Sequence, residues 1–158
     1  MRTMNLMAKG TRKHYINFTR KTNLQSSPNI VNQSFKTTSK NKIWFGDRTY
    51  IHTNEGTLYL STFIDSYTRK VVGWSMSSRI KESIAIDAFL QAYGKEQPEE
   101  GLIIHTDQGS QYTSYNFRTV VEDHEGILSN SRKGNPYDNA VMESFFKTIK
   151  RELINDSK

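Results

Sequence analysis

Three consecutive segments rich in aromatic and β-branched residues constrain the fold of this chain more than any other feature. The first two, residues 42–53 and 57–67, are separated by the turn-like Asn54-Glu55-Gly56, and the third spans residues 69–77. Runs of this composition bounded by turn residues are typical of β-strands, and connections this short join antiparallel neighbours. The sequence therefore predicts an antiparallel meander of three strands.

Helix and strand patterns alternate after the meander. Apolar residues at helical spacing, such as Ile84 and Ala88, predict a helix within residues 81–95, and we expect Gly94 to end it. Residues 101–106 then form a short continuous apolar run, the kind of strand that is buried in a parallel sheet.

A second helix, a further strand and a last helix complete the predicted order. The pattern indicates a helix over residues 114–126 and a short strand over 127–131. Asn135 is a good N-cap for the last helix, Pro136 fits its first position, and Asp138 falls where a capping box places its acid. The order β-β-β-α-β-α-β-α predicts an α/β fold with a mixed five-stranded sheet and helices on both faces.

Positive charge is concentrated at the start of the chain, whose formal net charge is +6 over 158 residues. Residues 1–42 contain nine Lys or Arg and no acid, whereas the remaining 116 residues contain 13 basic and 16 acidic groups. We expect residues 1–41 to be a basic linker or arm, and 42–156 to be one folded core. Such an arm suits a polyanion such as nucleic acid, although a solvated linker explains the composition equally well.

Two absences in the composition exclude whole classes of protein. The chain contains no cysteine, which excludes disulfides and thiolate metal sites. It also contains no apolar run near the ~20 residues of a membrane-spanning helix.

Three carboxylates stand at positions where an acid is unexpected or where α/β folds place their sites. Asp47 lies inside the first predicted strand, Asp107 follows the apolar strand, and Glu143 lies one turn into the last helix. Singly, each has an ordinary explanation as an edge-strand, turn or helix-surface residue. Together they match the oxygen ligands that Mg²⁺ prefers, and a two-ion site of this kind activates a hydroxyl for attack on a phosphodiester.

The last helix has an apolar face and a separate polar face. The apolar stripe is expected at Val141, Phe145, Ile149 and Leu153, widened by Met142 and Phe146. Glu143, Lys147 and Lys150 share the polar face, which Asn139 joins one turn earlier. The two lysines are either partners of an ordinary helical ion pair or contacts to phosphate beyond a metal-binding Glu143.

Basic residues elsewhere provide further candidate contacts to nucleic acid. Arg132 and Lys133 lie immediately upstream of the last helix, and Arg12 and Lys13 lie in the basic arm. Each is equally compatible with a solvated surface.

Several long segments resemble the OrfB-type transposases of bacterial insertion sequences, whose catalytic domain is a retroviral-integrase-like core of the DD(35)E type. The matching segments are DRTYI, EGTLYLSTFIDSYTRKVVGWSMS, HTDQGSQYTS and SRKGNPYDNAVMESFFKTIKREL, with a looser match in SPNIVNQSF. Asp107 and Glu143 are separated by 35 residues, the spacing for which the group is named. Arg48 departs from the family pattern, which commonly has an apolar residue there, and Asn130 stands where Met is usual. Arg48 is expected either to pair with Asp47 or to contact DNA.

The resemblance implies an RNase H-like fold and metal-dependent DNA strand cleavage followed by strand transfer. It implies two Mg²⁺ ions, for which Mn²⁺ substitutes, held by the triad Asp47, Asp107 and Glu143, and it makes Lys147 and Lys150 contacts to the element end. Supporting roles fall to the loop and helix-approach residues Gly109, Ser110, Gln111, Asn135, Asp138 and Asn139. Asp65 and His105 also match family segments and are expected to be a turn residue and a residue at the edge of the site.

The family further implies DNA partners, namely insertion-sequence ends and target DNA, with a homodimer or higher multimer acting in the bacterial cytoplasm. Family members carry a helical DNA-binding region upstream and an extension downstream, so the chain is expected to be a core fragment. Two alternatives stay open at this point: a truncated, non-catalytic DNA-binding remnant, and an RNase H-like nuclease acting on RNA–DNA hybrids.

Overall fold

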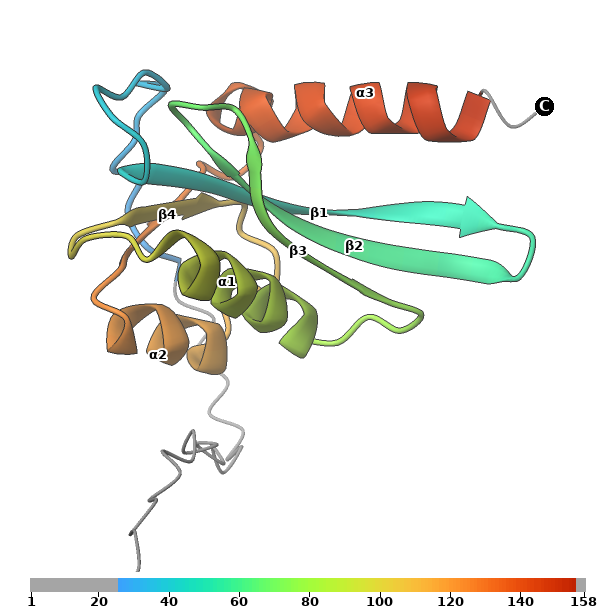
Figure 1. Cartoon of the computed structure of the whole chain (residues 1–158), viewed down its shortest axis with the longest axis horizontal. Helices are drawn as coiled ribbons and strands as arrows, with labels where there is room; N and C mark the ends of the chain where they lie inside the picture. The colour runs from blue at the N-terminus through green and yellow to red at the C-terminus, as the bar shows by residue number, and fades with distance from the viewer. Residues whose placement is uncertain (1–25, 156–158) are drawn as a thin grey trace, which may run out of the picture.

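The computed structural model describes the backbone of residues 26–155 and the side chains of residues 26–152 (Figure 1). The elements are β1 (Ile43–Thr53), β2 (Gly56–Asp65), β3 (Val71–Ser77), α1 (Ser83–Glu96), β4 (Ile103–Thr106), α2 (Tyr115–Asp123), β5 (Ile127–Asn130), the 3₁₀ turn η1 (Pro136–Asn139) and α3 (Ala140–Asn155). This order confirms the predicted succession of strands and helices.

The five strands form one mixed sheet in the order β3-β2-β1-β4-β5. β1, β2 and β3 are antiparallel neighbours, whereas β4 runs parallel to β1 and β5 runs parallel to β4. The prediction of an antiparallel meander followed by parallel strands is therefore confirmed. Because β4 has only four residues, it pairs with β1 from Ile43 to Gly46 and leaves the remainder of that edge of β1 without a strand partner.

One face of the sheet is covered by α1 and α2 (Figure 1). Phe89 of α1 and Phe117 of α2 pack there against Trp44, Phe63 and other sheet residues. α1 ends at Glu96 rather than at Gly94, so the predicted helix end was wrong. The helix continues because Gln97, whose φ is 45°, adopts the left-handed conformation and caps it by donating its N–H to the carbonyl of Tyr93.

The other face of the sheet is covered by α3 (Figure 1). Among the described side chains of this helix, Met142 and Phe146 are the buried apolar ones, while Val141 and Phe145 are partly buried and pack against the same core. The predicted apolar face is therefore confirmed at these four residues, with its most buried row at Met142 and Phe146, and its member Leu153 lies outside the described side chains. Asp138 is also buried and lies four residues before Met142, so the first residue of the buried row Asp138, Met142 and Phe146 is polar. A search for apolar periodicity does not detect such a residue.

Residues 26–41 contain no regular helix or strand, yet they contact the core along their length. Val31 is buried, the Ser27 N–H donates to Asn130 Oδ1 at 2.7 Å, and the Asn41 N–H donates to Asp65 Oδ1 at 2.7 Å. Asp65 also accepts from the Thr68 N–H at 2.8 Å, which confirms it as a turn residue. The division into an arm of residues 1–41 and a core of 42–156 stays a prediction. Within residues 26–155, none of the helices is long and apolar enough to cross a membrane.

Candidate active site

One cleft of about 750 Å³ brings the three predicted carboxylates together. Asp47 and Asp107 converge because each is the residue that follows the last paired position of β1 and β4, Gly46 opposite Thr106. Neighbouring strands lie about 4.8 Å apart, so these two side chains start from adjacent positions at one end of the ladder. The third carboxylate, Glu143, lies in the first turn of α3 and lines the same cleft. The other lining residues are Ser26, Gln108, Gly109, Ser110, Thr113, Ser131, Arg132, Lys133, Gly134, Asn135, Pro136 and Asn139.

Asp47, like Asp107, is partly buried, whereas Glu143 is exposed. Its Oδ1 accepts from the Arg48 N–H at 2.6 Å, and its Oδ2 accepts from Asn139 Nδ2 at 3.1 Å. Burial, and after it the nearby Asp107 carboxylate, raises the pKa of Asp47 from its usual 3.8 to about 7, against the opposing effects of Arg48. The site therefore favours a positive charge beside Asp47.

The loop after β4 orients Asp107 through Gly109. The Gly109 N–H donates to Asp107 Oδ1 at 2.9 Å, and a Cβ at Gly109 would lie only 2.9 Å from the same oxygen. Ser110 is exposed in the cleft. Gln111 is instead buried outside the cleft lining, where its carbonyl accepts from the Ser114 hydroxyl.

Glu143 and Lys147 are exposed on α3 and line a smaller neighbouring cavity of about 410 Å³. Lys150, one turn further on, is half-buried, and its Nζ lies 4.6 Å above the ring of Tyr50. Arg132 and Lys133 line the main cleft on its other side. Arg12 and Lys13 lie outside the described residues.

The donor chemistry of the cleft fits a hard divalent cation, although the side chains are not gathered as a metal cluster. Among the described residues, no three His, Cys, Asp or Glu groups lie close enough together to hold a metal ion. Two observations nevertheless point to a cation: the raised pKa of Asp47, and the buried Asn139 Oδ1, which has no hydrogen-bond partner. Carboxylate and amide oxygens are the ligands that Mg²⁺ accepts.

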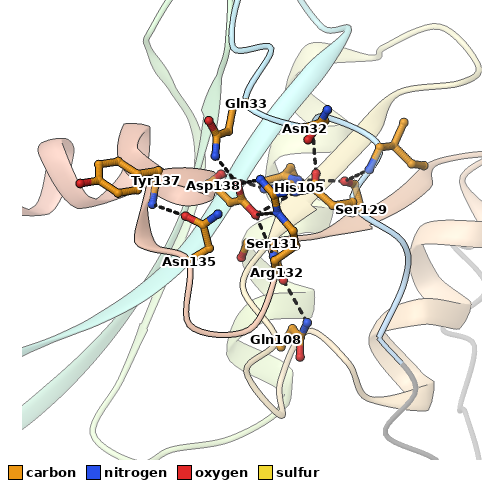
Figure 2. Close-up of polar contacts among 12 residues, drawn as sticks. Asn32, Gln33, His105, Gln108, Ser129, Ser131, Arg132, Asn135, Tyr137 and Asp138 are labelled. Carbon is orange, nitrogen blue, oxygen red and sulfur yellow. Dashed lines mark hydrogen bonds and ion pairs between the residues drawn. The ribbon is translucent and has the colours of Figure 1, made fainter.

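Asp138 lies behind the cleft, fully buried, and accepts five hydrogen bonds at 2.9–3.0 Å. Three come from the backbone N–H and the guanidinium of Arg132, and the others come from Asn29 and Gln33 (Figure 2). These donors, above all Arg132, hold the pKa of Asp138 well below its usual value. The predicted capping box was therefore wrong for Asp138, because its carboxylate is used by these donors. Asn135 does cap the turn, since its Oδ1 accepts from the Tyr137 N–H at 3.1 Å.

His105 connects this buried network to β5. Its Nε2 lies 3.0 Å from the Asp138 carbonyl, and its Nδ1 lies 2.9 Å from Ser129 Oγ (Figure 2). A carbonyl only accepts, so Nε2 carries the proton and Nδ1 accepts from the Ser129 hydroxyl. Burial lowers the pKa of His105, which keeps the ring neutral. His105 thus supports the backbone before Glu143.

Sequence reasoning missed the N-terminal contributors to this network. Asn29 and Gln33 reach Asp138, and the Ile30 N–H donates to Ser129 Oγ at 3.0 Å. The looser match in SPNIVNQSF contains all three N-terminal residues and was the signal available for them.

The mixed sheet and the helices on both faces, with Asp47 within β1 and Asp107 directly after β4, define an RNase H-like fold. The family model of the integrase core domain matches residues 37–136, and the chain belongs to this family.

The curated relatives include transposases of bacterial insertion sequences. The chain is 58% identical over 157 residues to the transposase for insertion sequence element IS904 of Lactococcus lactis subsp. lactis (strain IL1403), covering 99% of this chain and 62% of that protein. It is 40% identical over 155 residues to the transposase InsF for insertion sequence IS3A of Escherichia coli (strain K12), covering 98% of this chain and 54% of the relative. These matches confirm the resemblance to insertion-sequence transposases, and the chain spans roughly half to three-fifths of their length.

Solved integrase structures share the fold. A chain of the simian T-cell lymphotropic virus intasome in complex with PP2A regulatory subunit B56 gamma matches with a TM-score of 0.68 and 21% identity, covering 84% of this chain and 46% of that one. The HTLV-2 integrase catalytic core domain in complex with magnesium, in its trimeric form, matches with a TM-score of 0.62 and 23% identity, covering 77% and 74%. These likenesses confirm the predicted RNase H-like fold.

Proposed function

We propose that this chain is the catalytic core of a bacterial insertion-sequence transposase, which cleaves a DNA strand and joins the freed 3′ end to target DNA. The observation that supports this most strongly is the convergence of Asp47, Asp107 and Glu143, from three separate segments, on one open and basic-lined cleft. The transposases among the relatives of this chain support the same activity.

Asp47, Asp107 and Glu143 are the proposed catalytic residues and metal ligands. When bound, two Mg²⁺ ions, or Mn²⁺ in their place, activate the attacking hydroxyl and stabilise the leaving oxygen. Asn139 orients Asp47 through Nδ2, and its unpartnered Oδ1 is a further oxygen donor beside the site. Glu143 is exposed, so its side chain is free to turn toward the two aspartates when a cation is present.

The residues around the triad have proposed supporting roles. Gly109 holds Asp107, and Ser110 lies at the cleft surface where substrate enters. Gln111 stabilises the loop from within, Asn135 caps the approach to α3, and Asp138 fixes that approach from behind.

DNA contacts are proposed for the basic residues at the rim of the cleft. Arg132 and Lys133 line the cleft itself, while Lys147 and Lys150 follow Glu143 along α3. Arg12 and Lys13 are proposed to contact DNA from the arm of residues 1–41. Neutralised phosphates release counterions, so binding through these groups weakens steeply with salt.

The proposed partners are the ends of an insertion sequence and target DNA. We also propose that the chain acts as a homodimer or higher multimer in the bacterial cytoplasm. The integrase structures support a multimer by analogy, since they include an intasome and both dimeric and trimeric forms of a catalytic core.

The proposal is tested on a pre-branched DNA substrate that mimics the strand-transfer product, with Mg²⁺ or Mn²⁺. The wild type should yield metal-dependent cleaved or joined strands, and Glu143→Gln should yield none while keeping its circular dichroism spectrum and DNA affinity. Glu152→Gln, which alters an exposed acid on the same helix, is the matched control and should retain activity. Wild-type activity in Glu143→Gln would contradict the assignment.

A non-catalytic DNA-binding remnant is the second candidate. It is favoured by one observation: among the described residues, no three His, Cys, Asp or Glu groups are gathered closely enough to hold a metal ion. It predicts salt-sensitive DNA binding and no product with either metal. A nuclease acting on hybrids is distinguished in the same assay by preferential cleavage of an RNA–DNA duplex.

A further inference from the structure

A second cleft, of about 420 Å³, lies on the β1–β2 hairpin and takes no part in the proposed chemistry. It is lined by Arg48, Tyr50, His52, Thr57, Tyr59 and Ile80. The strand register explains the set, because Tyr50 pairs with Tyr59 and His52 pairs with Thr57 across the ladder. Side chains two residues apart on a strand share a face, which places Arg48 in the same row as Tyr50 and His52.

Arg48 gives this cleft a positive charge that no acid among the lining residues neutralises. Its Nη1 is buried and has no hydrogen-bond partner, and none of the residues that line the cleft is acidic. An arginine in the wall of a cleft without acids favours an anion such as phosphate in that cleft.

Aromatic side chains also line this cleft and offer surfaces on which a base can stack. Tyr50 is 53% exposed, and its ring meets that of His52 edge to face at 5.1 Å between centroids. Lys150 brings a second positive charge to the same ring, with its Nζ 4.6 Å above the centroid. Positive charge interleaved with exposed aromatic faces is the pattern that binds unpaired nucleotides, whose bases stack on rings while cations contact the phosphates.

The position of the cleft links it to the carboxylates. Asp47 and Arg48 are consecutive on β1, so their side chains point to opposite faces of the strand. Pairing of β1 with β4 ends at Gly46, which leaves the edge of β1 between the two clefts free of any described strand. The two clefts are thus lined by consecutive residues of β1, the carboxylate cleft by Asp47 and the hairpin cleft by Arg48.

We infer that the hairpin cleft binds an unpaired segment of the DNA strand that continues from the reacting phosphodiester. Arg48 contacts a phosphate there, and Tyr50 and Tyr59 stack against a base. The inference rests on the proposed function, because the strand in question is the one that the carboxylates act on.

The test compares two DNA duplexes of the same sequence, one blunt and one with a short single-stranded overhang, by fluorescence anisotropy in EDTA. The wild type should bind the overhang duplex about 10-fold more tightly, the order expected for one stacked base. Arg48→Gln and Tyr59→Leu should each remove most of that preference and leave affinity for the blunt duplex within about twofold. Lys70→Gln, which removes an exposed positive charge beyond the hairpin, should keep the preference.

Folding stability separates a binding role for Arg48 from a structural one. Since its buried nitrogen has no partner, Arg48→Gln should unfold at the same urea concentration as the wild type or a higher one. A variant that loses the overhang preference and also unfolds at markedly lower urea would indicate a structural residue and overturn the assignment.

The remaining outcomes distinguish this inference from the proposed function. Two results would overturn the assignment of the hairpin cleft as a single-strand site, even if strand transfer on the branched substrate is observed. One is a wild type without overhang preference, and the other is a pair of variants that bind both duplexes equally less tightly. An overhang preference that the variants remove, in a wild type without strand transfer, would support the cleft as a single-strand site and overturn the catalytic proposal alone.

Discussion

Asp47 and Asp138 both contact the segment that leads into α3, Asp47 through Asn139 and Asp138 through Arg132, and their surroundings differ in kind. Asp138 is fully buried, accepts five hydrogen bonds and has a pKa well below its usual value. Asp47 accepts two, lies beside Asp107, and has a pKa raised to about 7. The protein itself neutralises Asp138, whereas it leaves Asp47 short of positive charge.

The number of donors around a buried carboxylate and the direction of its pKa shift distinguish a structural carboxylate from a candidate metal ligand in this fold. Asp138 uses its lone pairs to hold the N-terminal segment, Arg132 and the approach to α3 together. Asp47 is held in place by its neighbours, and its pKa is raised. A cation bound beside it would lower that pKa.

Asp138→Ala should cause the largest loss of stability, about 3–4 kcal/mol in urea unfolding, because five donors lose a charged acceptor. The low pKa of Asp138 means that its contribution is present above about pH 4 and is lost as the pH falls further. Asn135→Ala is the control, since it removes one capping contact worth about 1 kcal/mol. Equal effects of the two variants would mean that Asp138 is only a helix cap.

Mg²⁺ should stabilise the folded chain through Asp47. At about 100 times the dissociation constant, a ligand that binds only the folded state adds about 2.7 kcal/mol, which raises the thermal midpoint by several degrees. Asp47→Asn should lose most of this shift. Asp123→Asn, which alters an exposed acid on α2, should keep it. A shift that is unchanged in Asp47→Asn would place the cation elsewhere.

Asp47→Asn should itself stabilise the metal-free protein at pH 8, by roughly 2 kcal/mol. The folded chain retains the Asp47 proton up to about pH 7, whereas the unfolded chain loses it near the usual 3.8. The free energy of unfolding of the wild type therefore falls as the pH rises between these values. Asn does not titrate, so the variant does not lose stability in this way. Unfolding in EDTA at pH 4.5 and pH 8 measures the effect, and a gain of equal size at both would rule out the titration of Asp47 as its cause.

Gly109→Ala should change stability by less than about 1 kcal/mol and weaken Mg²⁺ binding about 10-fold, because its Cβ displaces Asp107 Oδ1. Gly94→Ala is the matched control: a Cβ there meets nothing within 4 Å, so it should stabilise α1 by about 0.5–1 kcal/mol and leave Mg²⁺ binding unchanged. Both are measured by urea unfolding and calorimetric titration. Full metal affinity in Gly109→Ala would show that Asp107 adapts or is not a ligand.

The strands and the carboxylate positions were predictable because they depend on local pattern. Aromatic and β-branched runs between turn residues predicted β1, β2 and β3, and the apolar run predicted β4 as a parallel strand. The same patterns placed Asp47 within a strand and Asp107 directly after one, so their proximity followed once the two strands were taken as neighbours.

The sequence alone thus determined the order of elements, the mixed sheet and the candidate triad, because period and turn chemistry act over a few residues. Three features became known only from the tertiary structure: the rotation of α3, the residues that neutralise Asp138, and the direction of the Arg48 side chain. These depend on contacts between segments far apart in the chain, such as Asn29 with Asp138 or Lys150 with Tyr50. Burial and charge act through space, so the same acid becomes a structural anchor at Asp138 and a candidate ligand at Asp47.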